Sequence, residues 1–160
     1  MHTVIGGLMI FVSCSLVGFS AARVYRLRVN QLEAFLKLIK HIKAQIECFC
    51  APLCSILEGY EDTQLSACGF LLAARELGVR AGFESCRSRL FLSEDESDEL
   101  AKFFDGLGSH SADEESSGCA YYEKTIGDAL SRERSELAKR SKLCRTFGML
   151  AGVLLAVLLV

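Results

Sequence analysis

The segment LEAFLKLIKHIKAQIECF, residues 32–49, has the hydrophobic spacing of an α-helix. Its large apolar residues recur at alternating intervals of three and four: Leu32, Phe35, Ile39, Ile42, Ile46 and Phe49. This a/d pattern buries one stripe of a helix and leaves three lysines and Glu47 on the other faces. The segment therefore predicts a long helix that packs one face against other helices and shows water a basic face.

An uncharged stretch of 20 residues, TVIGGLMIFVSCSLVGFSAA, lies just upstream, from Thr3 to Ala22. As a helix it is about 30 Å long, which matches the hydrocarbon core of a bilayer. A cleaved signal peptide is the alternative, but no Lys or Arg precedes the stretch and three arginines follow it at once. Those flanks resist export. We expect a retained transmembrane helix over 3–22, continuous with the helix that follows.

A second apolar stretch lies at the other end of the sequence. Phe147 to Val160 contains 14 uncharged residues, or about 21 Å of helix, which is short for a full span. Arg145 can lengthen the span slightly by extending its side chain to the interface. We predict a second transmembrane helix over 146–160, with a buried core helix as the alternative.

Basic residues flank both predicted spans on the side of the middle region. They are Arg23, Arg26 and Arg28 after the first span, and Lys139, Arg140, Lys142 and Arg145 before the second. Because Lys and Arg beside a span stay in the cytoplasm, both termini are expected outside it, and residues 23–145 should form a cytoplasmic domain. The same basic residues can contact anionic membrane lipid.

Both predicted spans carry small residues at helical spacing. They are Cys14, Gly18 and Ala22 in the first span and Gly148 and Gly152 in the second. Small faces allow helices to approach closely in lipid. Our hypothesis is that the spans pack on each other, or on neighbouring helices, through these residues.

The middle region predicts further helices. Pro52 ends the first helix and starts a short one that stops at Gly59. A third helix is expected over 63–77, ended by Gly78, and a weaker fourth over 83–90. No run of alternating β-branched residues suggests a strand.

Two capping patterns mark the last two helices. Ser93 followed by Glu96 predicts a capping box, and Ser111 followed by Glu114 predicts a second cap. The first of these helices has a core face at spacing i, i+3, i+4, i+7: Leu100, Phe103, Phe104 and Leu107. The second is expected over about 113–144 and onward into the last span. The fold class is all-α, a cytoplasmic bundle of about six helices between two transmembrane helices.

No catalytic or ligand-binding motif is complete. GLGSH at 106–110 lacks the Lys of a phosphate-binding loop, and spacing places no His beside a Cys nucleophile. Cys48, Cys50 and Cys54 form a C-x-C-x3-C cluster, but a structural zinc site takes four ligands. Thiols in a reducing cytoplasm behave as small apolar groups. We therefore predict no enzyme activity, no cofactor or metal, and neither nucleic acid nor a small molecule as a ligand.

The arrangement of these features resembles one protein family over nearly the full length. A first span followed by arginines, a long helix, APL at 51–53, LG at 107–108 before a capped helix, and a closing span are arranged as in stage III sporulation protein AB of endospore-forming bacteria. Glu114 and Glu115 stand where the family pattern has a Gln near the start of the last helix.

The resemblance implies a helical bundle similar to the membrane platform protein F of type II secretion and type IV pilus systems. It places the chain in the mother-cell membrane facing the forespore, in a channel-like complex with other membrane proteins. It also implies a cytoplasmic partner, the ATPase stage III sporulation protein AA, which the chain would dock as a non-enzymatic platform. The alternative is a holin-like membrane protein whose spans act and whose cytoplasmic domain regulates them.

Overall fold

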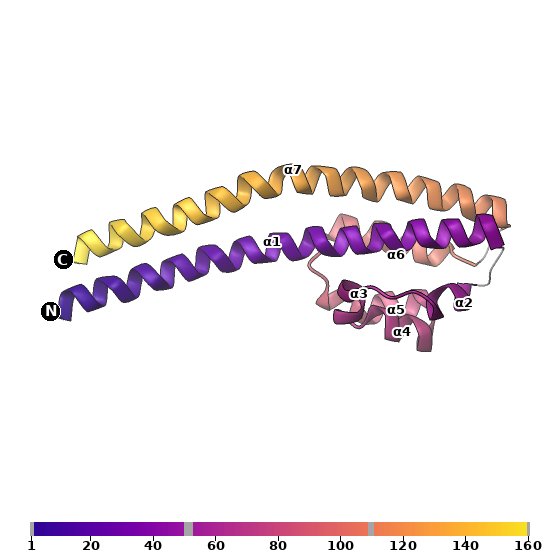
Figure 1. The fold of residues 1–160 in the computed structure, drawn as a ribbon, viewed down its shortest axis with the longest axis horizontal. Coiled ribbons are helices and arrows are strands. Elements are labelled where there is room, and N and C mark those ends of the chain that lie inside the picture. Colours follow the sequence, from indigo (N-terminus) through magenta and orange to yellow (C-terminus); the bar gives the residue numbers. More distant parts are fainter. Residues whose placement is uncertain (1, 50–52, 109–110, 160) are drawn as a thin grey trace. The chain divides into compact units, whose positions relative to one another are not determined.

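The structure is a computed structural model that describes residues 2–49, 53–108 and 111–159 (Figure 1). In the end segments 2–22 and 140–159, most side chains also lie outside the described part. Seven α-helices, one 3₁₀ turn and no strand are found in these ranges, which confirms the all-α class. The elements are α1 (His2–Phe49), α2 (Leu53–Glu58), α3 (Thr63–Ala67), α4 (Phe70–Leu77), α5 (Val79–Cys86), η1 (Arg87–Arg89), α6 (Glu94–Gly106) and α7 (Ala112–Leu159).

The chain forms two compact units. Residues 28–132 form one, which we call the core unit, and the outer parts of α1 and α7 form the other. Among the described residues, no helix has the length and apolar character needed to cross a membrane. Residues 3–22 and 146–159 are helical, but nearly all their side chains lie outside the described part, so both spans stay predictions.

Four phenylalanine rings form the centre of the core unit. They are Phe35 of α1, Phe70 of α4, Phe83 of α5 and Phe104 of α6. Each is at most 2% exposed, and the ring centroids lie 5.2 to 6.4 Å apart in all pairs. Such aromatic contacts are favourable beyond the area they bury. Because each ring comes from a different helix, the cluster joins four helices at one point.

The seam predicted on α1 is confirmed. Leu32, Phe35, Ile39, Ile42 and Ile46 are all buried, while the side chain of Phe49 lies outside the described part. Val29, Ala34 and Leu38 are buried as well. The buried stripe is wider than an a/d seam because α1 contacts α4, α5 and α6 through one phenylalanine and α7 through its lysines.

The prediction of a single helix over 63–77 is wrong, because the structure has two helices there. Gly69 takes a φ of 82°, in the left-handed region, which ends α3 and starts α4. Asp62 caps α3, since its carboxylate accepts hydrogen bonds from the N–H groups of Gln64 and Leu65 at 2.8 and 3.1 Å.

The helix predicted over 83–90 both begins and ends earlier than expected. α5 starts at Val79 and ends at Cys86, and η1 follows it. Gly82 lies where α5 approaches α4, because a Cβ on this residue would lie 2.6 Å from the backbone nitrogen of Ala74. Only glycine allows this approach, and the approach depends on tertiary packing that the local pattern does not contain.

The capping box predicted for α6 is confirmed. Ser93 Oγ accepts a hydrogen bond from the Glu96 N–H at 3.4 Å, and the Ser93 N–H donates to the Glu96 carboxylate at 2.8 Å. Three of the four predicted core residues are buried: Leu100, Phe103 and Phe104. Leu107 is only partly buried, which corrects the prediction. The helix ends at Gly106, and Leu107 has the extended backbone of a C-cap.

α7 begins at Ala112, close to the predicted start, and continues without a break to Leu159. The Ser111 N–H donates to the Glu114 carboxylate at 3.3 Å, which is one of the two bonds of the predicted capping box. Gly118 and Gly127 lie within the helix with open space where a Cβ would stand. The helix forms despite them, although each glycine weakens it by up to about 1 kcal/mol relative to alanine.

Candidate partner-binding site

The residues predicted to flank and pack the spans are only partly described. Arg23, Arg26 and Lys139 are exposed. The structure does not describe the side chains of three other flanking residues, Arg140, Lys142 and Arg145. The same holds for all five predicted packing positions: Cys14, Gly18, Ala22, Gly148 and Gly152. These assignments stay predictions.

Arg28 has a structural role that its place in the basic flank did not reveal. It lies at the start of the core unit, and its Nε and Nη2 donate to the two carboxylate oxygens of Glu96 at 3.1 and 3.0 Å. The Glu96 side chain is only 9% exposed. Two-point pairs of guanidinium and carboxylate are among the stronger polar contacts in proteins. Arg28 therefore fixes the start of α6 against α1.

The Glu96 carboxylate is ionised in the folded protein. Burial raises the pKa of Glu96, but the hydrogen bonds from Arg28 and Ser93 and the charge of Arg28 outweigh burial and lower the pKa below its usual value. One carboxylate thus serves both the capping box and the ion pair.

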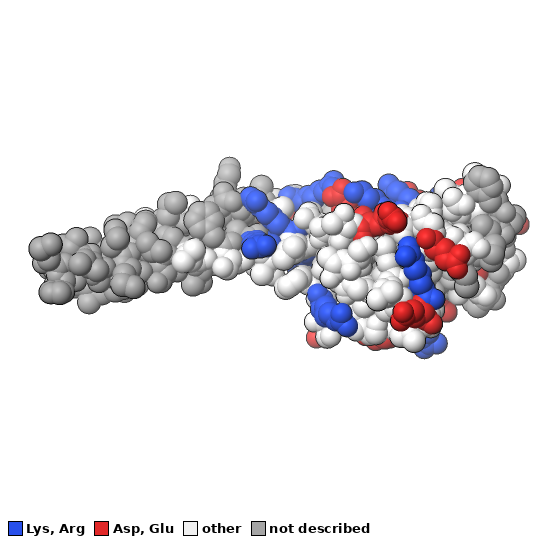
Figure 2. Space-filling model, turned by 60° about the horizontal axis from the view of Figure 1, so that its bottom comes forward, with Lys and Arg blue, Asp and Glu red and all other residues white. Residues whose placement is uncertain are grey.

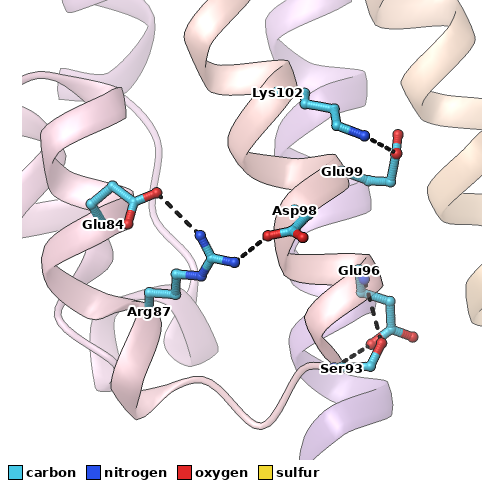
Figure 3. Close-up of polar contacts among 7 residues, drawn as sticks. All are labelled: Glu84, Arg87, Ser93, Glu96, Asp98, Glu99 and Lys102. Atoms are coloured by element: carbon cyan, nitrogen blue, oxygen red, sulfur yellow. Dashed lines mark hydrogen bonds and ion pairs between the residues drawn. The ribbon is translucent and has the colours of Figure 1, made fainter.

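Further ion pairs join α6 to the preceding helices (Figure 3). Arg87 lies between Glu84 of α5 and Asp98 of α6 and binds both, while Lys102 binds Glu99 within α6 at 2.7 Å. All of these side chains except Glu99 are more than a third exposed, so each pair contributes little to stability. These pairs do, however, place a carboxylate beside each of the two cations near α6, Arg87 and Lys102.

α1 contacts α7 through polar side chains. Glu123 binds Lys40 and Lys43 of α1 at 3.7 and 3.4 Å, and Ser116 Oγ donates to Glu47 at 2.6 Å. The lysine face of α1 was predicted to be solvated. This prediction is confirmed only in part, because the Lys40 side chain is 55% exposed while the Lys43 side chain is 27% exposed.

A pocket of about 360 Å³ lies between the end of α6 and the start of α7, and we call it the α6–α7 pocket. Its apolar wall consists of Phe103, Leu107, Cys119 and Tyr122. The backbone at Gly106 and Gly118 lines it as well. Since neither glycine has a side chain to fill the space, the pocket stays open between the two helices.

Three charged residues complete the lining: Lys102, Glu114 and Glu115. Lys102 binds Glu99, as described above. Glu115 Oε1 accepts a hydrogen bond from the Gly108 N–H at 2.6 Å, and Glu114 accepts from the Ser111 N–H. Both carboxylates are therefore held in place around the pocket by the loop between α6 and α7.

Cys119, fully buried in the pocket wall, keeps its proton. Burial raises the pKa of the Cys119 thiol to about 11, and the nearby negative charge of Glu115 acts in the same direction. A neutral thiol behaves as a small apolar group. The lining of the pocket is thus apolar at Cys119 and charged at Lys102, Glu114 and Glu115.

Acidic residues concentrate on the two helices that form the pocket. Residues 94–128 contain 11 Asp and Glu but only 2 Lys, while the whole core unit contains 18 Asp and Glu and 11 Lys and Arg. The face formed by α3, α4 and α5 differs, since Figure 2 shows acidic and basic side chains interspersed on it. The negative charge of the core unit therefore belongs mainly to α6 and the first half of α7.

No group of three metal-ligating side chains is found in the part of the chain that the structure describes, which includes the side chain of only Cys48 among the three clustered cysteines. Cys48 is exposed, which differs from the buried thiol expected there, and Cys50 and the Cys54 side chain lie outside the described part. Cys68, Cys86 and Cys119 are buried, as expected of apolar thiols.

No local pattern in the sequence predicts the α6–α7 pocket. Gly118 was the available signal, because a glycine at a half-buried position of a helix leaves space beside its neighbours. By itself, however, a glycine in a helix predicts only that the helix is less stable. The pocket requires Phe103 and Cys119 to come together from two helices, and no spacing rule predicts that pairing.

Comparison with known proteins identifies the family. The model of the stage III sporulation protein AB family matches residues 3–160, nearly the whole chain. No curated protein and no solved structure matches it. The chain therefore belongs to the stage III sporulation protein AB family, and its role lies in sporulation.

Proposed function

We propose that the protein is a non-enzymatic membrane platform that docks a cytoplasmic secretion-type ATPase, stage III sporulation protein AA, to the channel complex between mother cell and forespore. The family match over residues 3–160 is the observation that carries this proposal. A platform needs a folded surface and a membrane attachment, and it needs no catalytic group of its own.

The core unit supplies the folded surface. Its four phenylalanines, its capped α6 and the Arg28–Glu96 pair hold several helices in one compact arrangement. Its excess of carboxylates suits a protein partner with a basic surface, because charge complementarity speeds association and excludes wrong partners.

The end segments supply the attachment. α1 and α7 both continue as helices beyond the core unit into the uncharged stretches. In our proposal these stretches cross the mother-cell membrane that faces the forespore, with both termini outside the cytoplasm. Exposed Arg23, Arg26 and Lys139 support this orientation, since they lie beside the stretches and positive charge stays on the cytoplasmic side.

Co-purification tests the proposal. The full-length chain is solubilised in mild detergent, immobilised through a tag, and mixed with the purified ATPase at physiological salt. We expect retention of the ATPase on this chain and none on an unrelated two-span protein with the same tag. Absence of retention, together with dye release from vesicles that contain the chain alone, would instead support a protein whose spans act on the membrane.

A further inference from the structure

We propose that the α6–α7 pocket receives an apolar side chain from a basic segment of the docked ATPase. This inference rests on the proposed function and specifies where and how the ATPase is bound. The α6–α7 pocket has a volume of about 360 Å³, at the lower end of the range of roughly 300–1,000 Å³ typical of binding pockets. A pocket of this size suits an anchoring side chain and not a large cofactor.

The wall of the pocket suits an apolar anchor. Phe103 is 3% exposed and Cys119 is fully buried, and the ring of Tyr122 lies 5.2 Å from that of Phe103. Interfaces concentrate their binding energy at aromatic and apolar side chains that fill well-packed pockets. Tyr121, next along α7, is 62% exposed and extends the aromatic surface outside the pocket.

The charged residues that line the pocket determine which residues of the partner can lie beside its apolar side chain. Lys102 is already bound to Glu99, whereas Glu114 and Glu115 bring two carboxylates to the lining. Both accept a hydrogen bond from the backbone. Together with the acidic excess of residues 94–128, they favour Lys or Arg beside the anchor and disfavour an anionic lipid surface.

Gly118 allows a direct test, because a Cβ on this residue meets no atom within 4 Å. Gly118 lines the pocket, so Gly118→Leu adds a large apolar side chain to its wall, while Gly118→Ala adds one methyl group and serves as the matched control. Both replacements favour the helix over glycine, so neither should unfold the chain. Thermal melting of both variants checks this. We expect Gly118→Leu to weaken ATPase binding about tenfold or more, and Gly118→Ala to bind like the wild type.

A second pair of variants tests the charge. Glu114→Gln with Glu115→Gln removes both charges but keeps an oxygen that accepts each backbone hydrogen bond. Glu76→Gln, an exposed acid on α4 away from the pocket, is the control. We expect the double variant, but not the control, to weaken binding and to reduce its dependence on salt.

The outcomes separate the two proposals. If the wild type does not bind the ATPase, the proposed function fails and the pocket assignment fails with it. If the wild type binds and Gly118→Leu binds equally well, only the pocket assignment is overturned. A third outcome is that Gly118→Leu leaves ATPase binding intact but changes the oligomeric state of the chain measured without the ATPase. The pocket then receives a second copy of this chain, and the assignment of the pocket to the ATPase is overturned.

Discussion

Arg28 and Glu96 are 68 residues apart in the sequence, yet they form a two-point ion pair that joins α1 to the first turn of α6. The same carboxylate accepts the Ser93 N–H and closes the capping box. The position of α6, which forms one side of the α6–α7 pocket, therefore depends on a contact made at the boundary of the core unit.

Replacing Glu96 by Gln should destabilise the protein strongly. The variant removes the carboxylate charge that the Arg28 guanidinium binds in a partly buried two-point pair, and the loss of a hydrogen-bonded charge of this kind costs about 2 kcal/mol. Lys102→Met is the control, because the pair of Lys102 with Glu99 is exposed and its loss should leave the melting temperature unchanged. Equal melting temperatures for the two variants would contradict this role of Glu96.

The pair also predicts how stability depends on pH. The folded state lowers the pKa of Glu96, so the stabilisation is complete above the unfolded pKa of about 4.3 and is lost as pH falls through the lower folded value. The difference in melting temperature between the wild type and Glu96→Gln should be constant above about pH 5.5 and shrink below about pH 4.3. A difference that grows on acidification has the wrong sign for this account.

Two glycines in helices should respond oppositely to alanine. Gly82→Ala places a Cβ 2.6 Å from the Ala74 backbone nitrogen, so α5 and α4 must separate, at a cost of about 1–3 kcal/mol. Gly127→Ala places it in open space within α7 and should stabilise the protein by up to about 1 kcal/mol. Thermal melting of both variants measures the contrast, and equal shifts would argue against the close contact of α4 with α5.

The buried and exposed cysteines should differ in reactivity. Because Cys119 is buried and its thiol has a pKa of about 11, almost none of it is thiolate at neutral pH. Cys48 is exposed. Alkylation followed by mass spectrometry of peptides should therefore find Cys48 modified in the folded protein and Cys119 modified only after denaturation. Fast modification of Cys119 in the folded state would mean that the pocket wall opens.

Local patterns predicted the parts of the fold that local contacts determine. The seam of α1 and the box of Ser93 and Glu96 follow from spacing alone, because each involves residues within one or two turns of a single helix. The break at Gly69 did not follow, since glycine within a helical pattern takes either a helical or a left-handed conformation. Only the packing around α3 and α4 selects the φ of 82°.

The candidate site was less predictable than the fold. Arg28 was grouped with the basic flank because its partner lies 68 residues away. The pocket was missed because its wall combines residues of α6 and α7, and its space comes from glycines that have no side chain to give a pattern. The acidic composition of residues 94–128 was visible in the sequence, but only the pocket beside it suggests a use for that charge.

Membrane recruitment of the ATPase tests the central claim most directly. The ATPase is expressed with and without the full-length chain in a host that lacks all other sporulation proteins, and its share in the membrane fraction is measured. We predict that most of the ATPase sediments with membranes only when the chain is present, and that Gly118→Leu returns it to the soluble fraction while Gly118→Ala does not. An ATPase distribution that is the same with and without the chain would contradict the platform function.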